Sequence, residues 1–388
     1  MGETLQPVAT GFNRSLRVES RAERLTGDAG AVVLREIMER SGIVEWMTPQ
    51  LSDPRRQEDI VHDLASLIRT SVLLAAQGWR DHDDADALRD DPAFRLAASS
   101  AAGRRPLDRA HGLASQPTLS RFTAIMAEPA NRSVLRAAAL EFGVRAARAG
   151  RGGKRPRRMT LDVDSLPIEG EPGRATGSSG PANGHQSKAE WNGFYRSRIY
   201  HPLVTSVAEA GDMLDARLRP GAVGTAEGAT EVILDGERPR ATGPSAAAND
   251  RAQATLCDVA MVRIDAGFPS AGLLAGLEER GIDYVARLRA NAALDRLAAP
   301  YMKRPPGRRP AEPRMWLHSL IYQAESWDRP RRIVLVVQER EDDLLLDRFF
   351  LVTSLDHGQM SRREVLDHYR ERGTAEGHMG ELKDVLAP

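Results

Sequence analysis

Acidic residues stand in separate apolar segments where their carboxylates could act together. Asp162 and Asp164 lie two apart in MTLDVDSL, so their side chains point to the same face of a predicted strand. Asp265 ends the apolar run AMVRID, and active sites of α/β sheets collect at the carboxyl ends of strands. An acid at the end of an apolar strand also commonly caps the following turn, so position alone leaves both interpretations open.

A third acid belongs to a helix predicted from about Arg362. Ser361 and Glu364 form a capping box, which marks the start of this helix. At about 100° per residue, the spacings of six residues in it confine them to a sector roughly 80° wide. The six residues are Val365, Tyr369, Arg372, Glu376, Met379 and Lys383. A solvated charged face explains this pattern as well as a functional face does.

Three carboxylates from separate segments are what a metal-dependent phosphoryl-transfer site needs. Mg²⁺ prefers oxygen ligands and keeps water and substrate phosphate in its shell. Two such ions about 3.5–4 Å apart can activate an attacking oxygen and stabilise the leaving one. Nearby Arg and Lys side chains would hold the phosphate backbone.

The composition argues against several other classes of protein. The 388 residues favour two to three domains, and 54 Lys+Arg balance 54 Asp+Glu, so net charge gives no argument for a nucleic-acid or membrane partner. A single cysteine, Cys257, excludes an internally disulfide-bonded scaffold and a Cys/His zinc set. Without a signal peptide or an apolar run of about 18 residues, the chain is expected to be cytoplasmic.

The first part of the chain is expected to be helical. Apolar residues recur at helical spacing over about 28–49 and 57–78, and Pro117 suits the first turn of a third helix. The segment 145–158, RAARAGRGGKRPRR, is basic and rich in glycine. It is either a linker between domains or a segment that contacts phosphates.

Strands dominate from about residue 158 onward. HPLVTSVAEA and MLDARLRPG are predicted to form a hairpin with Gly211 and Asp212 in its turn. The expected elements after it are a helix over about 225–234, the strand DVAMVRID, a helix over about 273–280 and the strand DYVARLR. Three further strand-like runs follow before residue 355.

Two tryptophans flank one of these last strand-like runs. Trp316 and Trp327 either pack within this β-rich part or stack on an unpaired base at a DNA end.

The C-terminal spacing resembles a known signature. Tyr369-x2-Arg372-x3-Glu376-x6-Lys383 is similar to the Tyr-(2)-Arg-(3)-Glu-(6)-Lys signature of bacterial insertion-sequence transposases of the DDE class. VRIDAGF resembles the second-aspartate segment of that family, and LDVDS with GHQSKAEWNGFY, YHPLVT and LRPG resembles its first-aspartate region. SQPTLSRF is similar to the segment that precedes the catalytic domain. The likeness covers about residues 110–383.

The resemblance implies a catalytic triad of Asp164, Asp265 and Glu376 that binds Mg²⁺ or Mn²⁺, two ions in all. The family's first aspartate usually lies two residues before a Thr, and Leu166 takes that place here. Asp162 therefore remains a rival for the first metal ligand, or a support on the same face of the strand.

The resemblance also implies DNA contacts. Tyr369, Arg372 and Lys383 would contact phosphates of the transposon ends near the scissile bond. The expected partners are the terminal inverted repeats and target DNA, bound by a homodimer associated with the nucleoid. No membrane partner is expected.

The implied fold is α/β, with a ribonuclease H-like mixed sheet. We expect a mostly helical N-terminal domain over 1–150 that binds DNA ends. A catalytic domain over 155–388 follows, interrupted by a β-rich insertion at about 290–355. Relatives generally continue through more helix after the position of Lys383, so a C-terminally truncated copy is also expected.

The predicted function is DNA transposition. Metal-dependent cleavage would free the transposon ends, and strand transfer would join their 3′-hydroxyls to target DNA. Two alternatives remain, a non-catalytic remnant that binds DNA ends and a stand-alone ribonuclease H-like nuclease.

Overall fold

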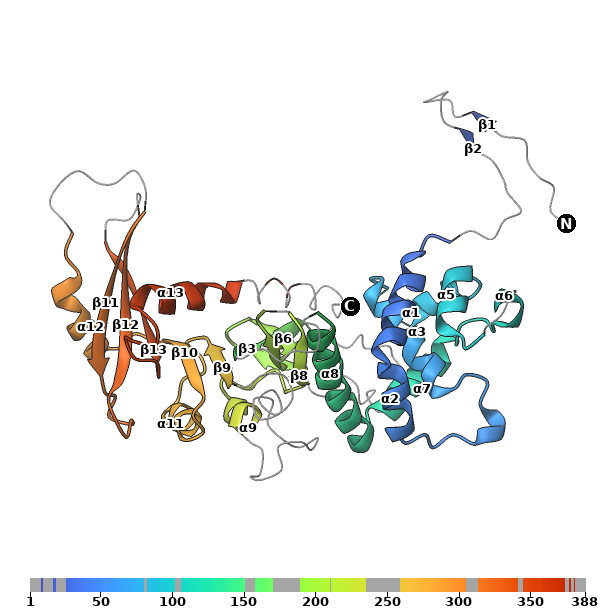
Figure 1. Ribbon diagram of the computed structural model, residues 1–388, viewed down its shortest axis with the longest axis horizontal. Coiled ribbons are helices and arrows are strands. Elements are labelled where there is room, and N and C mark those ends of the chain that lie inside the picture. The colour runs from blue at the N-terminus through green and yellow to red at the C-terminus, as the bar shows by residue number, and fades with distance from the viewer. Residues whose placement is uncertain are drawn as a thin grey trace. The chain divides into compact units, whose positions relative to one another are not determined.

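The computed structural model divides the chain into two compact units, Met1–Ala127 and Glu128–Pro388 (Figure 1). The structure describes residues 8–9, 17–18, 26–79, 82–101, 106–150, 158–169, 189–209, 211–234, 259–304, 313–340, 345–373, 377 and 380. Two predicted site residues, Glu376 and Lys383, lie outside these ranges.

The first unit contains short helices and one small pair of strands. Its described elements are β1 Val8–Ala9, β2 Arg17–Val18, α1 Gly30–Ser41, α2 Ile43–Met47, η1 Thr48–Gln50, η2 Gln57–Asp59, α3 Leu64–Ala76, α4 Asp83–Ala87, α5 Pro92–Ala98, α6 Pro106–Arg109 and α7 Gln116–Met126. Gly42 has a left-handed backbone (φ 60°) and separates α1 from α2, so the single helix expected over about 28–49 is interrupted. Buried Arg69 on α3 pairs with Glu45 on α2 at 2.9 Å and joins these two helices.

The second unit holds a long mixed sheet with helices beside it. Its helices are α8 Pro129–Gly150, α9 Ala229–Leu234, α11 Ala271–Glu279, α12 Ala292–Ala298, η3 Ala299–Tyr301 and α13 Arg362–Arg370. Its strands are β3 Arg158–Ser165, β4 Ile168–Glu169, β5 Glu190–Asn192, β6 Ser197–Tyr200, β7 Leu203–Val207, β8 Met213–Arg217, β9 Val259–Ile264, β10 Asp283–Leu288, β11 Arg314–Tyr322, β12 Arg331–Glu339 and β13 Asp347–Thr353. The division between units falls after Ala127, so α8, which contacts β8, belongs to the second unit.

Eight of the described strands form one sheet, in the order β11-β12-β13-β10-β9-β3-β7-β8. The central strands β3, β9 and β10 run parallel, and every other pairing in this sheet is antiparallel. The mixed sheet is compatible with the ribonuclease H-like fold that the resemblance implies. The predicted hairpin is confirmed as β7 and β8, with Gly211 at φ 72° between them.

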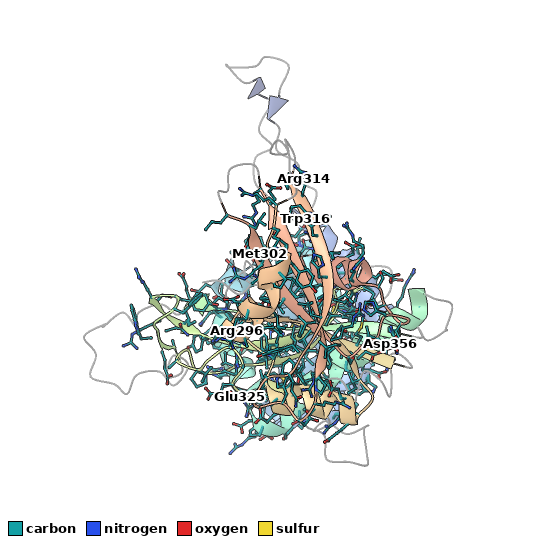
Figure 2. The ribbon with its side chains drawn as sticks, turned by 90° about the vertical axis from the view of Figure 1, so that its left-hand side faces the viewer. Arg296, Met302, Arg314, Trp316, Glu325 and Asp356 are labelled. Carbon is teal, nitrogen blue, oxygen red and sulfur yellow. The ribbon has the colours of Figure 1, made fainter. Side chains whose placement is uncertain are left out.

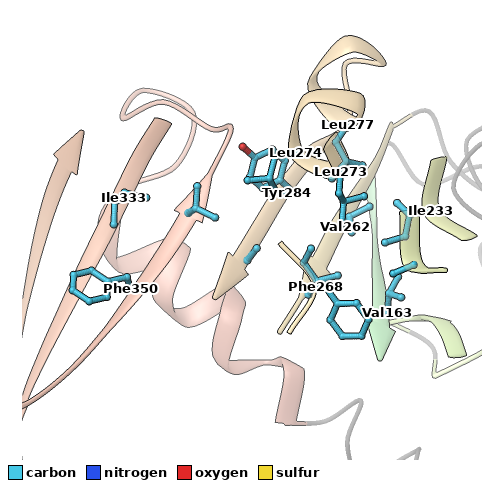
Figure 3. Packing of buried hydrophobic residues seen from close by; sticks show 14 of the residues in the cluster. Val163, Ile233, Val262, Phe268, Leu273, Leu274, Leu277, Tyr284, Ile333 and Phe350 are labelled. Atoms are coloured by element: carbon cyan, nitrogen blue, oxygen red, sulfur yellow. The ribbon is translucent and has the colours of Figure 1, made fainter. Parts of the chain in front are cut away.

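The expected β-rich insertion continues the same sheet. Strand β13 pairs with β10, and β12 and β11 follow at the outer edge. Both faces of β12 are covered. Ile333, Leu335 and Val337 belong to the large apolar cluster that also includes residues of α11 (Figure 3), whereas Val334 and Val336 pack with residues of α13. Burial on two faces explains the unbroken apolar run of this strand.

The two tryptophans of the insertion serve its packing. Trp327 is 9% exposed, with its ring 5.4 Å from that of Tyr322 and the Arg331 guanidinium 4.9 Å from its centroid. Trp316, labelled in Figure 2, lies on β11 and is half-buried against the same apolar cluster. The hypothesis that both indoles stack on DNA is therefore wrong for Trp327.

A charged network joins the insertion to the rest of the sheet. Glu278 on α11 is 7% exposed and accepts hydrogen bonds from Arg331 (2.8 Å), Tyr284 (2.6 Å) and Arg329 (2.9 Å). Burial alone would raise the pKa of Glu278. The hydrogen bonds from Arg331, Tyr284 and Arg329 outweigh it and lower this pKa from 4.5 to about 2.

We expect Glu278→Gln to destabilise the fold most near neutral pH. A carboxylate whose pKa is lowered by folding contributes stability above about pH 4.5 and loses that contribution as the pH falls toward 2. Wild type should exceed the variant by about 2–3 kcal/mol in free energy of unfolding at pH 7. Urea unfolding between pH 2.5 and 7 measures this gap, and a gap that does not narrow toward acid would contradict the prediction.

Candidate active site

Two predicted acids lie side by side where parallel strands end. β3 and β9 pair in parallel with Val163 opposite Ile264, so the next residues, Asp164 and Asp265, follow at the same edge of the sheet. The Asp164 side chain is 18% exposed and that of Asp265 is 40% exposed. Both line a cleft of about 820 Å³.

Asp162 lies on the same strand as Asp164, but its side chain is buried and paired inside the protein. It is 1% exposed, and its two carboxylate oxygens accept hydrogen bonds from Arg263 on β9 at 2.6 and 2.7 Å. Arg263 is likewise 1% exposed. The structure therefore gives Asp162 a buried cationic partner and leaves Asp164 facing the cleft.

Arg263 also contacts α13. Its guanidinium donates to the carbonyl oxygen of His368, in the last turn of that helix. The last carbonyls of a helix lack partners within it and carry the negative end of its dipole, so a buried cation satisfies both needs. One guanidinium thus connects β3, β9 and the end of α13.

The end of α13 brings two residues of the signature to the acids. Tyr369 is 9% exposed, and its hydroxyl donates to Asp265 Oδ1 at 3.2 Å. Arg372, two residues after the helix, pairs with Asp164 through Nη2 and lies 3.9 Å from Asp265 Oδ1 through Nη1. The guanidinium of Arg372 thus lies between the two carboxylates, and its contact with DNA phosphates, which the resemblance implies, stays a prediction.

The charges of the cleft are partly withdrawn from water. Burial raises the pKa of the Asp164 carboxyl above its usual value, although the positive charge of Arg372 acts in the opposite direction. Burial and the negative charge of Asp265 raise the pKa of the Tyr369 hydroxyl. Burial, together with the positive charges of Arg263 and Arg158, lowers the pKa of His368 to about 4.

The donor set fits a divalent cation. Asp164 and Asp265 offer hard oxygen ligands beside one cleft, and Arg372 compensates their charges in this structure. Within the described ranges no three His, Cys, Asp or Glu side chains form a metal-binding group. The third expected ligand, Glu376, lies outside those ranges.

Several residues of this site were not predicted from the sequence. Arg263 lies in the segment VRIDAGF, where an arginine within an apolar strand is the signal for a buried partner. Phe194, Tyr195 and His201 also line the cleft, and they belong to the segments GHQSKAEWNGFY and YHPLVT. Arg289, just after β10, adds an exposed cation.

Comparison with known proteins gives the family. The family model described as "Transposase DDE domain group 1" matches residues 8–387, nearly the whole chain. The chain belongs to this family of DDE transposase domains. Comparison with curated proteins gives no match. No helix in the described part of the chain is long and apolar enough to cross a membrane.

We expect Asp162→Asn to destabilise the fold more than Asp164→Asn does. The first change leaves buried Arg263 with only the exposed Glu371 carboxylate, 3.6 Å away, as an ion-pair partner, and breaking a buried pair typically costs about 3–5 kcal/mol of stability. The second removes a carboxylate that burial already disfavours in its charged form, and Arg372 keeps Asp265 as a partner 3.9 Å away, so we expect a smaller loss than in Asp162→Asn. Chemical denaturation of both variants measures these losses, and equal destabilisation would assign Asp164 a structural role.

Proposed function

We propose that this chain is an active DNA transposase that cleaves transposon ends and joins them to target DNA. One observation carries the proposal most directly: Asp164 and Asp265 end adjacent parallel strands and share one open cleft. Membership of the DDE transposase family supplies the class of reaction. The substrates would be the terminal inverted repeats of the transposon and target DNA, bound by a protein associated with the nucleoid in the cytoplasm.

The residues of the cleft have distinct proposed roles. Asp164 and Asp265, with Glu376, would hold Mg²⁺ or Mn²⁺, and the bound ions would supply an activated attacking oxygen and stabilise the leaving one. The hydroxyl of Tyr369 fixes the orientation of Asp265 through its hydrogen bond. Arg372 compensates the charge of the paired carboxylates, and its guanidinium would also donate to a phosphate bound beside them.

The same geometry bears on the non-catalytic alternative. A remnant that only binds DNA has no need of two paired, partly buried carboxylates in a cleft, because buried charge costs stability unless it is compensated. The retained Asp164–Asp265 pair therefore favours a catalytic protein over a DNA-binding remnant. A stand-alone nuclease would share this site, and strand transfer distinguishes it from a transposase.

We expect Asp164→Asn, Asp265→Asn and Glu376→Gln each to abolish Mg²⁺-dependent cleavage. Each change removes one negative oxygen ligand while keeping the size of the side chain. The assay uses a plasmid that carries the DNA flanking the gene, and scores both end cleavage and joining to a second plasmid. Thermal unfolding of each variant serves as the fold control. Cleavage by Asp164→Asn at the wild-type rate would refute the site, whereas cleavage without joining in wild type would identify a nuclease.

Arg372 and Lys383 are proposed to contact DNA phosphates during the reaction. We expect Arg372→Ala and Lys383→Ala each to weaken binding to DNA of any sequence. Each variant should also lower the magnitude of the slope of log K against log salt by about one, because binding with one phosphate contact fewer releases less condensed counterion. The measurement is DNA affinity at several salt concentrations with Mg²⁺ present. Arg348→Ala, which removes a half-exposed pair with Asp295, is the matched control. An unaltered slope in Arg372→Ala would confine that residue to its contact with Asp164.

A further inference from the structure

The most exposed large aromatic ring described in the second unit borders the cleft. Phe194 is 86% exposed and lies in the turn between β5 and β6, and both Phe194 and Tyr195 line the cleft that holds Asp164. A ring this exposed contributes little to folding, since it buries little apolar surface. At the edge of this cleft its ring is accessible to a ligand of the site.

Aromatic rings continue from this edge toward the interior. The rings of Phe194 and Tyr195 meet edge to face at 5.0 Å, and Tyr195 meets His201 in the same manner at 5.8 Å. The exposed fractions fall along this series from 86% to 39% to 2%. Burial, with a smaller contribution from the charge of Asp164, raises the pKa of the Tyr195 hydroxyl.

The turn that carries Phe194 is held rigidly. The side-chain oxygen of Asn192 accepts hydrogen bonds from the backbone N–H of Phe194 (3.0 Å) and of Tyr195 (3.4 Å), and its amide nitrogen donates to Gly221 O at 2.8 Å. Arg196 completes the turn with a left-handed backbone, φ 54°. Gly221 approaches β6 so closely that a Cβ would lie 1.9 Å from Ile199 O.

We propose that Phe194 stacks on an unpaired nucleobase next to the phosphodiester that the cleft cleaves, with Tyr195 and His201 supporting its ring. This inference rests on the proposed function. A nucleotide offers a phosphate to the carboxylate-bound cations and to Arg289, and it offers a flat apolar face to Phe194. Every base has such a face, so stacking tolerates any sequence. A base inside a duplex cannot present it, so the ligand is a frayed or extruded base.

The test uses a forked DNA duplex whose first unpaired base is 2-aminopurine, which loses fluorescence when it stacks. The titration of the full chain is made without divalent cation, so binding is measured apart from cleavage. We expect wild type to quench the probe and Phe194→Ala to bind the fork about tenfold more weakly with little quenching, in the range of one lost stack. Phe194→Trp should restore both signals, and Phe194→Leu should not.

Trp191→Ala is the matched control. Trp191 is 60% exposed on β5, one residue before Asn192, and it does not line the cleft. We expect this variant to bind the fork as wild type does, and all variants to bind a fully paired duplex equally. Equal fork binding by wild type and Phe194→Ala, or equal losses in Trp191→Ala, would overturn the inference. Plasmid cleavage in Mg²⁺ is scored separately, so a wild type that quenches the fork but cleaves nothing refutes the proposed function alone.

Discussion

The buried pair of Asp162 and Arg263 is the constraint on which the candidate site depends. Both side chains are 1% exposed, and two hydrogen bonds join them across the central strands. Taking two charges out of water is costly, and such a pair is retained at a net benefit only when its geometry is good and further hydrogen bonds complete it. The carbonyl of His368 provides the additional partner.

This pair also holds the end of α13 against the central strands. Apolar contacts of Val365 and Leu366 hold α13 against the sheet, but such contacts do not define its rotation or register. The hydrogen bond from Arg263 to the carbonyl of His368 defines both, because it joins one particular carbonyl in the last turn of α13 to one particular position on β9. Tyr369 and Arg372 consequently meet Asp265 and Asp164. The Asp162–Arg263 pair thus supports the site without entering the cleft.

Much of this arrangement could be predicted from local sequence. The capping box at Ser361, the hairpin at Gly211 and the apolar strands depend on neighbouring residues, and the structure confirms each of them. The meeting of Asp164 and Asp265 follows once both strands are taken as parallel neighbours. Family resemblance supplied the triad, but the placement of Glu376 stays a prediction.

The remaining features depend on contacts between distant positions. Arg263 and Asp162 are 101 residues apart, and nothing local in the sequence distinguishes their pairing from other arrangements of charge. The exposure of Phe194 arises from how the β5–β6 turn is held by the chain at Gly221, again far along the sequence. Trp327 is the opposite case. Two residues that contact it, Tyr322 and Arg331, are close to it in the sequence.

Direct titration with Mn²⁺, followed by electron paramagnetic resonance, tests the central claim that Asp164 faces the cation site while Asp162 supports it from within the protein. The comparison is made between wild type, Asp164→Asn and Asp162→Asn under conditions where all three are folded. We expect Asp164→Asn to bind Mn²⁺ at least about tenfold more weakly than wild type, a loss of about 1.4 kcal/mol or more. Asp162→Asn should lose less Mn²⁺ affinity than Asp164→Asn does. Wild-type affinity in Asp164→Asn, together with lost binding in Asp162→Asn, would contradict the account.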